Sequence, residues 1–173
     1  MMMILDSAGI PPLTDHERSA DDDNPNGYYE FERVKKLKAG DVGWMDAAPG
    51  SAVKVISALL QYLPDKFHYK VLFMQRALPE ILASQRNMLI RRGENPDRIS
   101  DEEMGNYFKD HIANVIKWLS NQPNIEHMII DYNELMINPS PQIKKINIFI
   151  GGDLDEEKMK NAINPALYRQ RSR

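Results

Sequence analysis

The sequence predicts an α/β domain with three layers, in which helices cover both faces of a parallel sheet. Three short runs of β-branched and apolar residues, at 52–57, 69–74 and 126–130, have the composition of buried parallel strands. Two helical segments, 78–92 and 101–121, lie between the second run and the third. Strands that alternate with helices indicate a layered α/β fold, because parallel strands need long crossover connections.

The first forty residues contain two helical segments and a long connection between them. Residues 2–9 have the pattern of the end of a helix. Residues 10–27 carry three prolines and an acidic run at 21–23, which favours a surface loop. Residues 28–37 are amphipathic at helical spacing, and basic residues followed by Gly40 mark the end of that helix.

Helix signals also mark the second half of the chain. Ser100 followed by Glu103 is a capping box and predicts the start of the helix at 101–121. Three short helices are expected after the last strand run, at 132–136, 141–150 and 155–162. The final ten residues are polar and basic without periodicity, so we expect a tail there.

Composition limits the class of protein. A chain of 173 residues with 42% hydrophobic residues is long enough for one compact domain, and we treat residues 1–173 as a single domain. The absence of cysteine, of a membrane-length apolar stretch and of a signal peptide predicts a soluble, cytoplasmic protein. The net charge of −3 argues against nucleic acid as a partner, although a local site for a small anion remains compatible with it.

The most informative stretch is residues 69–89, where a strand run leads through Arg76 and Pro79 into a helix. In α/β folds, ligands bind beyond the carboxyl ends of the strands, where helix N-termini offer N–H groups to anions. Arg76 stands at such an end, and Ser84 follows about two helical turns later. A guanidinium and a hydroxyl together suit a phosphate group.

This arrangement resembles a motif of the sulfotransferase family. Arg76-x7-Ser84 after an apolar strand is similar to the site at which that family holds the 3′-phosphate of its donor, 3′-phosphoadenosine-5′-phosphosulfate (PAPS). Further resemblances lie in the run Asp131-Tyr132-Asn133-Glu134-Leu135, in Asn138-Pro139, in Phe149-Ile150-Gly151 and in the end Tyr168-Arg169-Gln170-Arg171. The early segment 9–32 looks like a bacterial branch of the family.

The resemblance implies a P-loop-type fold and transfer of a sulfonate group from PAPS to a hydroxyl or amine acceptor, with no metal ion. Arg76 and Ser84 would bind the donor's 3′-phosphate, and Arg169 and Arg171 would approach the nucleotide from the tail. The partners implied are the nucleotide donor, which leaves as the desulfonated nucleotide PAP, and an acceptor that the sequence does not identify.

One family motif is missing from the 173 residues. The 5′-phosphosulfate loop, P-[RK]-[ST]-G-[ST]-[ST], has no match, and the opening MMMILDSAGI resembles the family's first helix just after that loop. We therefore expect the first strand and the P-loop to be absent, the domain to be truncated relative to the family, and turnover to be slight or nil. A start codon assigned too late, or an artificially shortened chain, is the explanation we favour over a real loss of the loop. An exposed sheet edge would favour homo-oligomers.

An acceptor hydroxyl needs a general base. In the sulfotransferase family a general base often comes from a histidine near the end of the strand that corresponds to residues 52–57. In this sequence that run ends in Ser57 and no histidine follows it, so no histidine base is expected at that position. The candidates are Asp15, His16, Glu17 and Glu30, of which Glu30 and His16 are our choices. We expect no metal site, since His68, His111 and His127 lack companion ligands at suitable spacing.

Two other functions remain open on the sequence. The chain is compatible with a non-catalytic remnant that binds nucleotide or acts through protein partners. It is also compatible with a small-molecule kinase of P-loop fold, in which Asp131 would be the candidate magnesium ligand, although the loop G-x4-G-K-[ST] of such kinases is not found.

Overall fold

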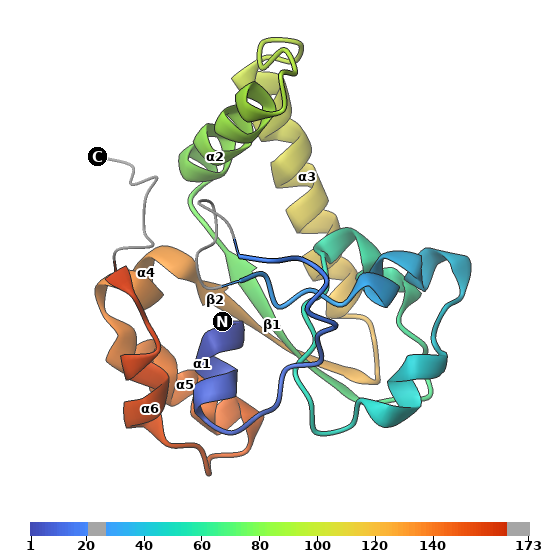
Figure 1. Ribbon diagram of the computed structural model, residues 1–173, viewed down its shortest axis with the longest axis vertical. Coiled ribbons are helices and arrows are strands. Elements are labelled where there is room, and N and C mark those ends of the chain that lie inside the picture. The colour runs from blue at the N-terminus through green and yellow to red at the C-terminus, as the bar shows by residue number, and fades with distance from the viewer. Residues whose placement is uncertain (21–26, 166–173) are drawn as a thin grey trace.

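The computed structural model describes residues 1–20 and 27–165 (Figure 1). The N-terminal part consists of helix α1 (Met2–Ser7) and three 3-10 helices, η1 (Glu32–Ala39), η2 (Gly43–Ala47) and η3 (Ser57–Tyr62). The remainder consists of β1 (Tyr69–Gln75), α2 (Leu78–Arg91), α3 (Asp101–Leu119), β2 (Ile125–Asp131), α4 (Tyr132–Ile137), α5 (Pro139–Ile150) and α6 (Glu156–Asn161).

Strands β1 and β2 form a parallel pair, which confirms the strands predicted at 69–74 and 126–130. The register runs from Tyr69 opposite Ile125 to Gln75 opposite Asp131. Helices α2 and α3 make the crossover and project from the sheet as a hairpin (Figure 1). The two helices pack closely at Gly105, where an added Cβ would lie 3.4 Å from Leu78. The sheet and its crossover are an α/β arrangement, as the sequence predicts.

The strand predicted at 52–57 is wrong. Within the described residues this segment makes a single parallel bridge, between Ala52 and Pro12, and then continues in extended form into η3. A run of β-branched residues becomes a strand only where a neighbouring strand pairs with it. No second strand lies beside residues 53–56 in the described part of the chain.

The predicted helix at 28–37 is also shifted and has a different geometry. It begins at Glu32 as a 3-10 helix, ends at Ala39 and is capped by Gly40, whose φ of 85° is readily adopted by glycine. Asp15, from the loop before it, accepts the backbone N–H of Glu32 at 2.6 Å. Tyr28 to Phe31 therefore form part of the connection and not of the helix.

The capping prediction for α3 is confirmed. Ser100 accepts the backbone N–H of Glu103 at 3.1 Å, and the helix begins at Asp101. The helices after β2 also match the predicted segments closely, and α4 is capped by Asp131, which accepts the N–H of Glu134. No helix among the residues described here has both the length and the apolar character needed to span a membrane.

Apolar side chains pack on both faces of the sheet. On one face, Ile130 packs with Ile4 of α1 and with Leu135, Ile143, Ile146 and Met159 of the C-terminal helices. On the other face, Phe73 packs with Leu119 of α3 and Leu60 of η3. A third cluster, which includes Trp44, holds the 3-10 helices together. The sheet is therefore covered by helices on both sides.

Candidate functional site

The carboxyl ends of β1 and β2 bring Arg76 and Tyr132 together. Each residue directly follows the last strand pair, Gln75 opposite Asp131. The guanidinium carbon of Arg76 lies 5.1 Å from the centre of the Tyr132 ring, a cation–π contact. Burial raises the pKa of the Tyr132 hydroxyl. The cation predicted from the sequence thus stands at the carboxyl edge of the sheet.

A buried carboxylate orients Arg76. The Nε of Arg76 donates to Oε2 of Glu80 at 2.7 Å, and the Glu80 side chain is only 1% exposed, compared with 25% for Arg76. Glu80 lies in the first turn of α2, four residues after Arg76. The ion pair therefore has an inner, fully buried partner and an outer partner that reaches toward solvent.

Asn133 connects this ion pair to the second strand. Its Nδ2 donates to Oε1 of Glu80 at 2.8 Å, and its Oδ1 accepts the backbone N–H of Ala77 at 3.1 Å. Both carboxylate oxygens of Glu80 are thus hydrogen-bonded, and the chain between β1 and α2 is tied to the start of α4. Together Arg76, Glu80, Tyr132 and Asn133 form a network that we call the Arg76 cluster.

Ser84 lies on α2, one helical turn beyond Glu80. Residues four apart share a face of a helix, so Ser84 is on the same face as the carboxylate that holds Arg76. Its side chain is exposed. The other two candidate ligands, Arg169 and Arg171, lie outside the described residues.

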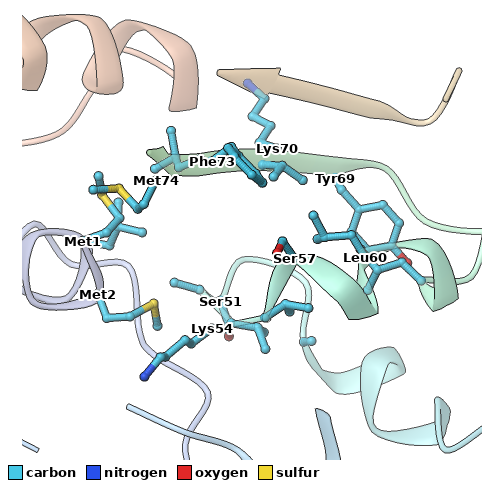
Figure 2. A pocket seen from close by; sticks show the side chains of 18 of the residues that line it. Met1, Met2, Ser51, Lys54, Ser57, Leu60, Tyr69, Lys70, Phe73 and Met74 are labelled. Carbon is cyan, nitrogen blue, oxygen red and sulfur yellow. The ribbon is translucent and has the colours of Figure 1, made fainter. Parts of the chain in front are cut away.

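A cavity of about 970 Å³ extends along β1 (Figure 2). Arg76 is among the residues that line it. Its walls are the full length of β1, the extended residues 52–55, the first residues of α1 and the inner side of α3. Tyr69 stands at the amino end of β1, where its hydroxyl donates to the carbonyl of Pro64 at 2.7 Å, and burial raises its pKa to about 12. Trp44 is buried and also lines the cavity.

A serine and a histidine meet in this cavity, a pairing that sequence reasoning missed. The Ser57 hydroxyl and Nε2 of His111 are 2.8 Å apart, and both residues line the cavity. They are 54 positions apart and lie on η3 and α3, so no local pattern connects them. The only sequence signal is that the run 52–57 ends in a polar residue.

Glu30 and His16, the two residues chosen from the sequence as general bases, lie outside the cavity. Oε1 of Glu30 is 3.2 Å from Arg18 and 3.4 Å from Lys54, and Lys35 approaches its other oxygen. His16 is exposed in the connection after α1. Neither Glu30 nor His16 lines the cavity.

Asp15, also a candidate, holds its loop in place. Its carboxylate accepts the backbone N–H groups of Glu17 and Glu32, and these hydrogen bonds lower its pKa. No group of three or more potential metal-ligating side chains occurs among the described residues.

Comparison with known proteins supports the resemblance seen in the motifs. The family model "Sulfotransferase domain" matches residues 61–171, which include β1, the Arg76 cluster and β2. No curated protein and no solved structure matches the chain. Since the matched segment covers well over half of the 173 residues, the chain belongs to the sulfotransferase domain family.

Proposed function

We propose that the Arg76 cluster binds the 3′-phosphate of PAPS and of its desulfonated product PAP. The observation that carries this proposal is the position of a guanidinium, oriented by a buried carboxylate, at the carboxyl edge of a parallel pair of strands. The general preference of α/β folds for ligands at this edge supports it. The family assignment supports a nucleotide donor of this type.

The chemistry of the cluster suits a phosphate. A guanidinium presents its N–H donors in a planar fork that suits phosphate oxygens, and the bond from Nε to Glu80 fixes the plane of that fork. The Ser84 hydroxyl, on the same helix face as Glu80, is proposed as a further donor. Because Glu80 offsets one positive charge, we propose that Arg169 and Arg171 contribute the additional charge that a phosphate dianion requires.

The reaction we propose is transfer of a sulfonate group to a hydroxyl or amine by in-line displacement at sulfur, on a P-loop-type fold. The acceptor's proton would pass to a general base, for which Glu30 and His16 stay predictions. His111, which the Ser57 hydroxyl contacts within the cavity, is an additional candidate. The family assignment favours sulfonate transfer over the phosphoryl transfer of a kinase.

Turnover by the 173 residues alone is proposed to be slight. No run in them matches the loop that would hold the 5′-phosphosulfate, and preorganised donors around a leaving group are often the largest contribution to catalysis. Measurable PAP binding without sulfonate transfer would favour the non-catalytic alternative for this chain. Single-domain organisation and cytoplasmic location likewise stay predictions.

Isothermal titration with PAP tests the role of Arg76. We expect Arg76→Ala to weaken PAP binding about 10- to 100-fold, since a hydrogen bond to a charged group contributes roughly 1.5–3 kcal/mol. Arg86→Ala is the matched control, because Arg86 lies on the same helix but pairs with exposed Asp97. Equal affinity of wild type and Arg76→Ala would refute the assignment, and so would an equal loss in both variants.

A further inference from the structure

The hydroxyl of Ser57 and the imidazole of His111 form a pair whose geometry is set by packed elements. Ser57 Oγ and His111 Nε2 are 2.8 Å apart. Ser57 begins η3 and His111 lies within α3. These two elements pack against each other through the apolar cluster that contains Leu60 and Leu119. The short distance between the two groups is therefore supported from both sides.

The Ser57 hydroxyl bonds differently from the other hydroxyls of the chain. A serine near the start of a helix commonly bonds to a neighbouring backbone group. Within residues 1–20 and 27–165, four other serine or threonine hydroxyls form hydrogen bonds, and all four bond to the backbone: Ser7, Thr14, Ser100 and Ser120. The Ser57 hydroxyl instead bonds to the His111 side chain. It is thus not used to fix the local backbone.

His111 lies on the inner face of α3. Phe108 and Ile112, which share that face, line the cavity with it, whereas Asp110 and Asn114 are exposed. In the described part of the chain, Ser57 is the only side chain that bonds to the His111 ring. A neutral imidazole with its hydrogen on Nδ1 accepts a proton at Nε2. In that tautomer, Nε2 is placed to take the hydroxyl proton of Ser57.

The surface beside the pair is apolar and open to the cavity. Figure 2 shows the Ser57 side chain projecting into the space below the strand that carries Phe73. Leu60, Phe73 and Ile112 belong to one apolar cluster, and all three line the cavity. An uncharged, apolar group would lose water-exposed surface there, which favours its binding.

The lysine and arginine side chains of the lining have partners of their own. The amino group of Lys54 points away from the space (Figure 2) and donates to the carbonyl of Tyr28 at 3.0 Å. The amino group of Lys70 donates to two carbonyls at the end of α5. Arg76 is bonded to Glu80. The apolar surface next to Ser57 therefore favours an uncharged ligand over an anion.

We propose that Ser57 and His111 are a nucleophile and its base, and that they hydrolyse an uncharged ester with an apolar acyl group. Ser57 Oγ attacks the carbonyl carbon of the ester while Nε2 of His111 takes the hydroxyl proton. The imidazolium then returns this proton to the departing alkoxide, which leaves as the alcohol, and an acyl-serine remains. This activity is separate from sulfonate transfer and does not depend on it.

Water completes the reaction. It attacks the acyl-serine while His111 takes a proton from it, and the imidazolium returns the proton to Ser57 Oγ as the carboxylic acid leaves. The only co-reactant is therefore water. No carboxylate bonds to the His111 ring in the described residues, so the ring lacks the orienting third group of a catalytic triad. We therefore expect slow turnover.

The probe for this activity is p-nitrophenyl butyrate. Because p-nitrophenolate is a much better leaving group than a serine alkoxide, the acyl-serine should form faster than water removes it. We expect a burst of p-nitrophenolate stoichiometric with the chain, followed by slow release. Mass spectrometry of the intact chain should show one added butyryl group, and peptide mapping should place it on Ser57.

Variants of both residues separate the two roles. Ser57→Ala should abolish the burst, and His111→Ala should slow acylation of Ser57 at least about 100-fold, as expected for loss of a general base. Added imidazole should restore acylation in His111→Ala, because it replaces the base but not the packing of a side chain. His111→Gln, which retains more of the side-chain volume, should show the same loss.

The controls are a second serine and a second histidine of the lining. Ser51 and His68 line the same cavity, but neither takes part in a serine–histidine hydrogen bond in the described chain. Ser51→Ala and His68→Ala should acylate at the wild-type rate. Far-UV circular dichroism and urea unfolding establish that each variant is folded.

Several results would overturn the proposal. One is a butyryl group on lysine or histidine side chains with none on Ser57. Another is an undiminished burst in Ser57→Ala, or acylation of His111→Gln at the wild-type rate. An equal loss in Ser51→Ala or His68→Ala would also refute the pair, and so would a folded His111→Ala that imidazole does not rescue.

Discussion

Replacement of Glu80 by alanine is expected to lower the free energy of unfolding by about 3 kcal/mol, because it removes the buried partner of an ion pair together with the hydrogen bonds that this carboxylate accepts. Glu80 is almost fully buried and accepts hydrogen bonds from both Arg76 and Asn133. Without it, the Asn133 amide and the Arg76 guanidinium each lose the hydrogen bond to this carboxylate. The variant should therefore lose PAP affinity as well as stability.

Urea denaturation of three variants measures the Glu80 effect. Glu80→Gln retains an acceptor for Asn133 but not the negative charge. Its free energy of unfolding should therefore lie between those of wild type and Glu80→Ala. Glu102→Ala is the control, since Glu102 is exposed in the first turn of α3 and its loss should cost about 0.5 kcal/mol or less. If Glu80→Ala unfolds at the same urea concentration as Glu102→Ala, the carboxylate does not hold the site together.

Replacement of Ile146 by alanine should cost about 2–5 kcal/mol of stability, as expected for a large-to-small change in a packed core. Ile146 of α5 is fully buried in the cluster that contains Ile130 of β2 and Leu135 of α4. The same cluster holds β2 and α4 on either side of the junction that carries Asn133. Loss of packing there should loosen the Arg76 cluster indirectly.

A residue on the opposite side of α5 is the control for Ile146. Ile148 is 66% exposed, so Ile148→Ala should change the free energy of unfolding by no more than about 0.5 kcal/mol. Thermal and urea unfolding of both variants give the comparison. Similar losses for the two positions would mean that α5 does not pack on the sheet as described.

The elements that could be predicted from sequence are those with a strong local signal. The Ser100 capping box predicts the start of α3, and the apolar runs at 69–74 and 126–130 predict the two strands. The run at 52–57 has the same composition, yet it lacks a pairing neighbour in the described chain and stays extended. Strand formation depends on a partner far away in sequence, which a local pattern does not report.

The candidate site likewise contains one feature that a local sequence pattern predicts and others that depend on residues far apart in the sequence. The position of Arg76 after a strand was sufficient to predict that it stands at the carboxyl edge. The contact between Asn133 and Glu80 spans 53 positions, and that between Ser57 and His111 spans 54, so both arise only from the packing of distant elements. The choice of Glu30 and His16 as bases rested on the loop between α1 and η1, for which the sequence contains no signal of direction.

A crystal structure of the chain with PAP tests the central claim most directly. The account predicts the 3′-phosphate within hydrogen-bonding distance of both the Arg76 guanidinium and the Ser84 hydroxyl, with the bond between Arg76 and Glu80 intact. A nucleotide bound with its 3′-phosphate on other side chains, away from the carboxyl end of β1, would contradict it.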